Sequence, residues 1–332
     1  MTSPIRAGET AHSNFPAVSV VLPVLNEAMH LKQSIATILS QSYQGDIEVI
    51  MAIGPSQDRT NEIAQEICRQ DSRVSMVENP SGRTPNGLNL AIARARHEII
   101  VRIDGHSEID KTYIAVAVET LERTGAVNVG GIMAAEGITN FQKATARAMR
   151  SLIGVGPSKF HTGGSSGSAD TVYLGVFKKS ALVEIGGFDE RFTRAQDWEM
   201  NYRLRKAGGA IWFDPRLIVT YRPRPDIGKL ARQYFEYGRW RRAVARSYPE
   251  TVSIRYLAAP TALTINIFSI ACGLVFNNLF FLPVLSYIAL VTFGGLAIGK
   301  SWQERIRLPF ILTAMHMSWG WGFISSPRKL MS

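Results

Sequence analysis

The chain has 332 residues and a formal net charge of +10, which allows one large domain or two ordinary ones. No charged residue occurs between Tyr256 and Gly299, and a second charge-free run extends from Leu308 to Ser326. Runs of this length exclude a purely soluble protein, whereas the chain before Arg255 has the evenly spread charges of a globular domain. The composition therefore predicts a globular domain followed by a membrane region.

Positive charge gathers directly before the first apolar run. Between Arg222 and Arg246 there are eight lysine or arginine residues and only two acidic ones, Asp226 and Glu236. Positive residues that flank a membrane segment mark its cytoplasmic side, and no nucleic-acid-binding module is visible. The charge therefore indicates a lipid bilayer rather than nucleic acid as partner, with the globular domain on the cytoplasmic face of the cell membrane.

The N-terminus and the cysteines agree with that location. Residues 1–16 are polar and lack the apolar core of a secretory signal, so we interpret them as a flexible tail. Cys68 and Cys272 form neither a metal-spaced pair nor a disulfide framework, and free thiols fit a reducing compartment. The sequence does not determine the oligomeric state.

From residue 18 onward, apolar runs of strand type alternate with segments of helical periodicity. Strands are expected at 18–22, 47–53, 74–77 and 99–103, and a helix follows each of the first three. Nearly continuous apolar strands joined by helices are typical of a parallel sheet with helices on both faces, an α/β fold. No Gly-x-Gly-x-x-Gly follows the first strand, so a dinucleotide-type phosphate loop is not expected.

The remaining chain is less regular. Helices are expected at 110–122, at 141–150 and from about residue 197, and strands at 127–133, 171–177, 211–213 and 217–221. A basic, aromatic helix is expected over 227–247, which suits a helix lying in the membrane interface. A solvent-facing helix with an ordinary aromatic core stripe is the alternative.

The apolar runs predict a membrane region. Residues 255–276 and 279–299 are each long enough to span a bilayer, and the short turn between them makes them a hairpin. For 308–326 a third span and an interfacial or re-entrant segment both remain open. The predicted divisions are a tail (1–16), a globular domain (17–225), an interfacial helix (226–250) and a membrane region of two or three helices (254–326).

Polar residues follow several strands of the expected sheet. The fourth strand ends in Asp104-Gly-His106, while Asn26 and Glu27 follow the first strand and Asp58 follows the second. Asp104 and His106 are of metal-ligating types, and ligands of open α/β sheets bind beyond the carboxyl ends of the strands. The pattern favours a metal and diphosphate site, although each segment alone could be only a strand-end turn or a helix cap.

A glycine- and serine-rich segment lies between residues 161 and 170 and includes Gly163, Gly164 and Ser165. Such a composition cannot pack a core, so the segment is a surface loop or a mobile lid. We favour a lid, because loops of this kind often close over substrates.

Taken together, the motifs up to about residue 200 resemble the family 2 glycosyltransferases, which have the GT-A fold (Rossmann-like). The matching motifs are Pro23-Val-Leu-Asn26-Glu27, Ser56-Gln-Asp58-Arg-Thr60, Gly87-Leu-Asn89-Leu-Ala91, Asp104-Gly-His106, Gly186-Gly-Phe-Asp-Glu190 and Gln196-Asp197. Within this family the chain is similar to the membrane-associated, succinoglycan-type exopolysaccharide glucosyltransferases, which share the Asp-x-His motif, the helix Tyr234-Phe-Glu-Tyr-Gly-Arg-Trp-Arg241 and the apolar runs.

The resemblance implies roles for these residues. Asp197 would be the base that deprotonates the acceptor hydroxyl, with Glu199 as its nearest rival, and Asp104 and His106 would hold Mn²⁺ or Mg²⁺ against the donor diphosphate. Asp58 would accept a hydrogen bond from the nucleotide base. The further donor-binding residues are Pro23, Asn26, Glu27, Arg83 and Asn89. The residues implied on the acceptor or diphosphate side are Arg239, Trp240, Gly163, Gly164 and Ser165.

The expected function is inverting transfer of a sugar from a nucleotide-diphospho-sugar, a UDP-hexose, to a polyprenyl-diphosphate-linked or other lipid-linked acceptor in cell-surface polysaccharide synthesis. The alternatives are a polyprenyl-phosphate glycosyl synthase and a catalytically silent nucleotide-sugar-binding partner of a membrane complex. Two positions depart from the family: Ile53-Gly54 replaces an acidic strand end, and Gln196 stands where glutamate is common.

Overall fold

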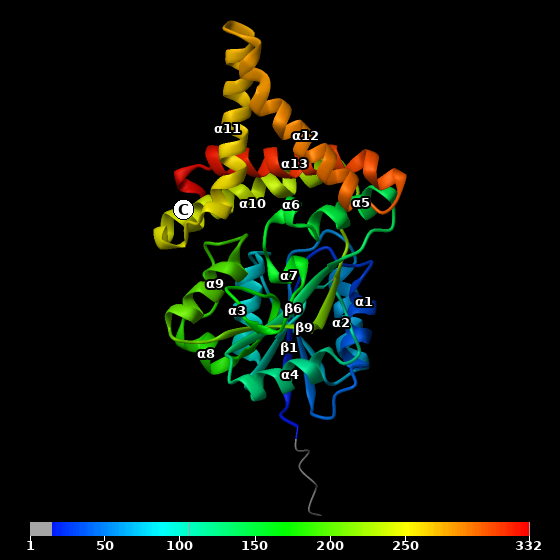
Figure 1. Cartoon of the computed structure of the whole chain (residues 1–332). Helices are drawn as coiled ribbons and strands as arrows, with labels where there is room; N and C mark the ends of the chain where they lie inside the picture. The colour runs from blue at the N-terminus through cyan, green and yellow to red at the C-terminus, as the bar shows by residue number, and fades with distance from the viewer. Residues whose placement is uncertain (1–14, 106, 332) are drawn as a thin grey trace, which may run out of the picture.

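A computed structural model describes residues 15–105 and 107–331 (Figure 1). The metal-binding prediction for His106 and most of the predicted tail therefore lie outside the described residues. Within them, nine strands form one sheet whose main path runs β3-β2-β1-β4-β8-β6-β9-β5, with β7 paired beside β9. The prediction of a mostly parallel sheet with helices on both faces is confirmed.

The first half of the sheet is parallel throughout. It consists of β1 (Val18–Val24), β2 (Ile47–Ile53), β3 (Val74–Glu78) and β4 (Ile99–Arg102), with β1 in the centre between β2 and β4. Their carboxyl ends meet at one edge, because parallel strands point in the same direction. The polar residues that follow β1, β2 and β4 are thereby brought to a common edge.

The second half of the sheet contains both parallel and antiparallel strand pairs. β8 (Tyr173–Lys178) lies antiparallel between β4 and β6 (Asn128–Ala135), and β6 is parallel to β9 (Ile211–Tyr221). The short strands β5 (Glu108–Ile109) and β7 (Gly167–Ser168) pair antiparallel with β9.

Helices cover both faces of the sheet (Figure 1). One layer packs on alternate side chains of β1 such as Val20 and Leu22, and it contains α1 (Leu31–Leu39), α2 (Thr60–Gln70) and α4 (Tyr113–Thr124). The other packs on the opposite side chains such as Val21, and it contains α3 (Thr84–Arg94), α8 (Lys179–Glu184) and α9 (Gln196–Lys206). Burial on both faces explains the continuous apolar runs of the sequence.

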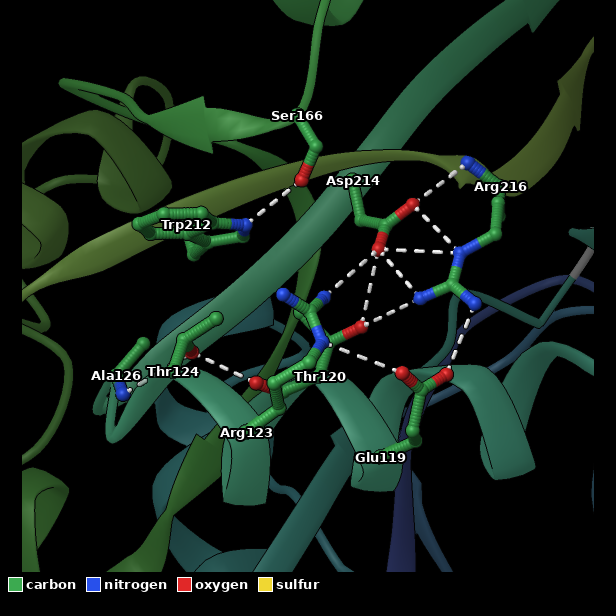
Figure 2. Close-up of polar contacts among 9 residues, drawn as sticks. All are labelled: Glu119, Thr120, Arg123, Thr124, Ala126, Ser166, Trp212, Asp214 and Arg216. Carbon is green, nitrogen blue, oxygen red and sulfur yellow. Dashed lines mark hydrogen bonds and ion pairs between the residues drawn. The ribbon is translucent and has the colours of Figure 1, made fainter.

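The two short strands expected at 211–213 and 217–221 are one strand, β9, with an irregularity in its pairing to β6. Asp214 lies at this irregularity and is 2% exposed. Figure 2 shows its carboxylate accepting hydrogen bonds from Arg216 (2.8 Å from Nη2) and from the Thr120 hydroxyl on α4 (3.1 Å). Burial alone would raise the pKa of Asp214, but these hydrogen bonds lower it overall. The polar network lets the chain continue through the irregularity as one strand.

The membrane-proximal part lies beyond one end of this sheet domain. The connecting helices are α5 (Asn140–Met149), α6 (Leu152–Val155) and α7 (Lys159–Thr162). The last third of the chain forms α10 (Ile227–Ser247), η1 (Pro249–Thr251), α11 (Ile254–Val275), η2 (Asn278–Phe281), α12 (Leu282–Ile298), α13 (Trp302–Ser325) and η3 (Arg328–Met331). In Figure 1, α10 and α13 lie side by side across the domain, and α11 and α12 project away from them.

The spans 254–275 and 278–298 are long and apolar enough to cross a membrane, and within the described residues no other helix meets this criterion. In their most apolar segments only 28% and 11% of the residues are buried, so packing inside the protein does not account for their composition.

Helix α13 contains the charge-free run 308–326 for which the sequence left two interpretations open. Its apolar side chains, among them Leu308, Ile311 and Met315, are buried against α10 and α5. The two helices approach backbone to backbone: a Cβ on Gly238 would lie 2.0 Å from the Trp319 carbonyl, and a Cβ on Gly322 would lie 2.0 Å from the Phe235 carbonyl. This packing favours the interfacial interpretation over a third span.

Candidate active site

The loops after β1 and β2 are tied together by backbone and side-chain hydrogen bonds. Asn26 has a positive φ of 56°, and its side-chain oxygen accepts from the Gln57 amide at 2.7 Å. The Asp58 carboxylate accepts from the amides of Ala28 (3.1 Å) and Thr60 (3.0 Å). The hydrogen bond from the Thr60 hydroxyl is the main cause of a lowered pKa for Asp58. In this arrangement the carboxylate holds the two loops together directly before α2 (Thr60–Gln70).

The end of β4 adjoins the end of β1. A Cβ on Gly105 would lie 3.1 Å from Cγ of Glu27, so the chain after Asp104 passes close to the Glu27 side chain. Asp104 is partly exposed at this edge. Asp104 and Glu27 therefore lie at the same strand-end edge, as predicted from the parallel sheet.

Arg102, at the end of β4, joins the two acidic residues that the sequence singled out. Its guanidinium is 3.2 Å from Asp104 through Nη2, and its Nη1 donates a short hydrogen bond to Asp197. The Arg102 side chain is 4% exposed, whereas the Asp104 and Asp197 side chains are 23% and 30% exposed. One buried cation thus places both carboxylates beside each other at the mouth of the site.

Asp197 and its rival Glu199 have different surroundings. Asp197 lies in the first turn of α9, which follows Ala195 in the left-handed conformation (φ 58°). Glu199 is fully buried, pairs with Arg203 at 2.6 Å and accepts a hydrogen bond from the Tyr248 hydroxyl at 2.8 Å. Because Glu199 has no access to solvent, Asp197 is the carboxylate of the pair that a substrate can reach.

The predicted donor residues on α3 and β1 lie in varied positions. The Asn89 side chain donates to the Phe188 carbonyl (2.8 Å) and accepts from the Phe188 amide (2.8 Å), so it clamps the segment that leads to α9. Arg83 is exposed at the start of α3, and Pro23 is partly buried within β1. The contacts of Asn89 explain its place in the motif without a ligand.

The two predicted acceptor residues, Arg239 and Trp240, have different surroundings in the structure. Arg239 pairs with Glu236 on the same helix at 2.8 Å and lies over the Phe235 ring. Trp240 is 5% exposed and packs against Phe192, so its ring is a core contact between α10 and the segment before Asp197 and not an open sugar platform. Phe192 is distant from Trp240 in the chain, so the sequence around Trp240 gives no sign of this burial.

The predicted lid is a short exposed arc with anchored ends. Gly163 and Gly164 have positive φ values of 79° and 137°, and residues 164–166 are exposed. At the end of the arc, Trp212 donates from Nε1 to the Ser166 hydroxyl at 2.8 Å (Figure 2). The strand β7, which follows, pairs with β9. Ser165 and the two glycines are thus the part of the segment free of such pairing.

The metal-ligating groups at this edge of the sheet fit a divalent cation that takes most of its ligands from a bound diphosphate. Asp104 supplies carboxylate oxygen, a hard ligand suited to Mg²⁺ or Mn²⁺. The described residues contain no group of three or more histidine, cysteine or acidic side chains placed to hold a metal by themselves.

Sequence reasoning missed Arg102. The available signal was a charged residue in the last position of an otherwise apolar strand, Ile99-Ile-Val-Arg102. A buried arginine there requires an acidic partner. Asp104 lies two residues further on, but the other partner, Asp197, lies 95 positions further along the chain.

Replacing Arg102 by methionine is expected to lower the free energy of unfolding by roughly 3 kcal/mol, because breaking a buried ion pair leaves unpaired charge behind. Arg102→Lys keeps the positive charge but lacks the guanidinium whose two nitrogens reach both carboxylates. It should lower the free energy of unfolding by a smaller amount. Denaturant unfolding of the purified protein measures both values. The matched control is Arg59→Met, since Arg59 pairs with Glu62 in an exposed i,i+3 contact, and a change of at most about 0.5 kcal/mol is expected there. Equal effects of both methionine variants would contradict a structural role for Arg102.

Comparison with known proteins agrees with this geometry. The model of the family described as "Glycosyl transferase family 2" matches residues 19–186. Succinoglycan biosynthesis protein ExoA of Rhizobium meliloti (strain 1021) is 32% identical over 92% of this chain and 93% of that protein. A dolichyl N-acetyl-alpha-D-glucosaminyl phosphate 3-beta-D-2,3-diacetamido-2,3-dideoxy-beta-D-glucuronosyltransferase of Methanococcus voltae is 22% identical over 67% of this chain and 71% of that protein.

Among solved structures, a mannosyltransferase from Pyrobaculum calidifontis in complex with GDP-Man and Mn²⁺ has a TM-score of 0.59 and 19% identity, covering 91% of this chain and 86% of that one. This likeness concerns the fold. The family match and the relative of similar length identify the chain itself: it belongs to glycosyl transferase family 2 and is a glycosyltransferase.

Proposed function

We propose that this enzyme transfers a hexose, with inversion, from a UDP-sugar to a polyprenyl-diphosphate-linked acceptor during cell-surface polysaccharide synthesis. The observation that carries the proposal is the pair of carboxylates, Asp104 and Asp197, held side by side by Arg102 next to helices that can enter a membrane. One carboxylate faces the donor and the other faces the acceptor. The relative with succinoglycan biosynthesis in its name supports the product class.

In this proposal Asp197 accepts the proton of the acceptor hydroxyl while the hydroxyl oxygen attacks the anomeric carbon from the face opposite the diphosphate. The bond from that carbon to the diphosphate oxygen breaks, and its electron pair leaves with the nucleoside diphosphate. Asp104, with His106, would hold Mn²⁺ or Mg²⁺, which when bound stabilises the charge on the leaving diphosphate. The Mn²⁺ reported with the Pyrobaculum mannosyltransferase supports the use of a divalent cation.

The remaining site residues take supporting roles. The loops carrying Asn26, Glu27 and Asp58 form the donor end of the cleft, with Arg83 at its exposed rim. Gly163, Gly164 and Ser165 close over the substrates, and Arg239 faces the acceptor side. The basic helix α10 lies against the cytoplasmic leaflet, where anionic lipids attract arginine and lysine.

A polyprenyl-phosphate glycosyl synthase is the second candidate. The Methanococcus relative, whose name specifies an acceptor sugar already carried on dolichyl phosphate, favours the first candidate over it. The two candidates differ in whether the acceptor lipid already carries a sugar.

Membranes that hold the protein, supplied with a lipid extract, are expected to release nucleoside diphosphate from one member of a panel of nucleotide sugars. The release should stop when a chelator removes divalent metal and resume when Mn²⁺ is added back. Extraction of the product into organic solvent identifies a lipid-linked acceptor. Transfer to bare polyprenyl phosphate would favour the second candidate, and no transfer to it would favour the first. Release with no lipid-soluble product from any donor would contradict the proposal.

A further inference from the structure

Two cavities meet where the sheet domain touches the membrane-proximal helices. The larger, of about 560 Å³, is lined by α6, α7, α10, α11, α12 and α13, and its walls include Ile153, Tyr234, Ala262, Leu290 and Met315. Its volume lies in the range of small-molecule sites, and its walls are mainly apolar. The smaller, of about 260 Å³, is lined by residues of the glycine-rich segment and by Trp198.

The two cavities adjoin, because they share part of their lining, and together they are called the path below. Pro157, Ser158, Phe160, Arg255 and Tyr256 line both of them. Trp198, in the wall of the smaller cavity, directly follows Asp197 in the chain. The path thus leads from the apolar space beside the membrane hairpin to the neighbourhood of the proposed base.

Positive charge gathers at this border. The Arg255 guanidinium donates to the Pro157 carbonyl, and Arg241 lies between the rings of Trp198 and Tyr256, 4.0 Å and 3.6 Å from their centroids. Neither arginine forms an ion pair with a carboxylate among the described residues. Arg241 is 6% exposed, and within the part of the chain that the structure describes its Nε and Nη1 have no hydrogen-bond partner.

The other polar groups of the path do not neutralise this charge. Asp170 lines the smaller cavity, but it is exposed and lies 3.5 Å from Arg205. His161 lines the larger cavity, where burial, reinforced by Arg255, lowers its pKa to about 3, so the imidazole is neutral at physiological pH. Lys159 adds a further cation to the smaller cavity.

An apolar space that ends at unpaired guanidinium groups is complementary to a long-chain lipid phosphate. Guanidinium pairs with phosphate through parallel hydrogen bonds, and the apolar walls would bury the adjoining carbons of the chain. A free anion would leave the larger apolar cavity unfilled, and an uncharged lipid would leave the Arg255 guanidinium without an anionic partner.

We propose that the path is the acceptor site, with the phosphate or diphosphate of a polyprenyl lipid at Arg255 and the first isoprenoid units in the larger cavity. Arg241, behind Tyr256, adds charge to the border without touching the lipid. The inference rests on the proposed function, which it deepens by assigning the acceptor to named residues.

Binding of polyprenyl phosphate to the full-length protein in detergent tests the headgroup contact. Arg255→Gln is expected to weaken it roughly tenfold to hundredfold, the usual loss for a hydrogen bond to a charged group. Arg232→Gln, which removes the same charge from an exposed position of α10, should stay within about twofold of the parent protein. UDP binding should be the same in all three proteins, because the donor site lies at the strand ends.

A second variant tests the contact between the larger cavity and the isoprenoid chain of the lipid. Ala262→Trp, which fills the larger cavity, should weaken the binding of polyprenyl phosphate but leave the binding of inorganic phosphate unaffected. Leu274→Trp, at a position that is 76% exposed on the same helix, is the matched control for folding.

The outcomes separate this inference from the proposed function. Transfer to polyprenyl lipid with unchanged binding in both Arg255→Gln and Ala262→Trp would place the acceptor elsewhere and overturn the inference alone. Binding of inorganic phosphate as tight as that of the lipid would also overturn it, as a free-anion site. Transfer only to soluble acceptors, with no lipid bound by the parent protein, would overturn both.

Discussion

Asp197→Asn is expected to lower the rate of sugar transfer by roughly 10²- to 10⁴-fold, the range in which a positioned general base contributes. Asparagine has nearly the same shape and can still accept a hydrogen bond from Arg102, but it cannot take up the proton of the acceptor hydroxyl. Binding of the nucleotide sugar should be unchanged, because the proposed role of Asp197 begins at the acceptor. Transfer rates at saturating donor and acceptor, with donor affinity measured separately, give the comparison.

Glu199→Gln is the matched control for this experiment. Glu199 is buried in contact with Arg203 and Tyr248, so its replacement should lower the unfolding temperature while the folded protein keeps its turnover. If Asp197→Asn transferred at the normal rate and Glu199→Gln did not, the assignment of the base would have to be exchanged between them.

Asp104→Asn should lower transfer by roughly 10²- to 10³-fold and shift the activating Mn²⁺ concentration upward, because a bound divalent ion stabilises the transition state by several kcal/mol. The amide keeps one oxygen ligand but loses the negative charge that attracts the cation. Titration of the transfer rate with Mn²⁺ and with Mg²⁺ measures the shift.

Glu108→Gln provides the control, since this carboxylate lies four residues further along and pairs only at the surface, with Arg222 at 3.3 Å. Its metal titration should overlay that of the parent protein. Identical metal titrations for Asp104→Asn and the parent protein would remove Asp104 from the metal site.

Much of the fold could be predicted because its signals are local. The strand at 47–53 is a continuous apolar run, and the helix at 227–247 begins where the Asp226 side chain accepts from the Lys229 amide at 2.8 Å. By contrast, the insertion of β8 between β4 and β6 depends on which distant strands pair, and a single strand carries no mark of its neighbours.

The site divides in the same way. The carboxylates at the strand ends could be found because a parallel sheet brings strand ends together, whereas Arg102 and Trp240 acquire their roles from residues such as Asp197 and Phe192 that are distant in sequence. In the sequence, Arg241 is one of several positive residues of a basic helix. Only the folded chain places it between two aromatic rings, one from α9 and one from α11.

The crossing of α10 and α13 at Gly238 and Gly322 has a consequence for sequence variation. At each glycine even a methyl group would lie 2.0 Å from a carbonyl oxygen of the opposite helix, so the smallest residue is required at both positions. Relatives that keep the two helices in contact should therefore retain this pair of glycines, although 84 positions separate them. Outward-facing positions of the hairpin, such as Leu274 and Phe293, are free to exchange among apolar residues.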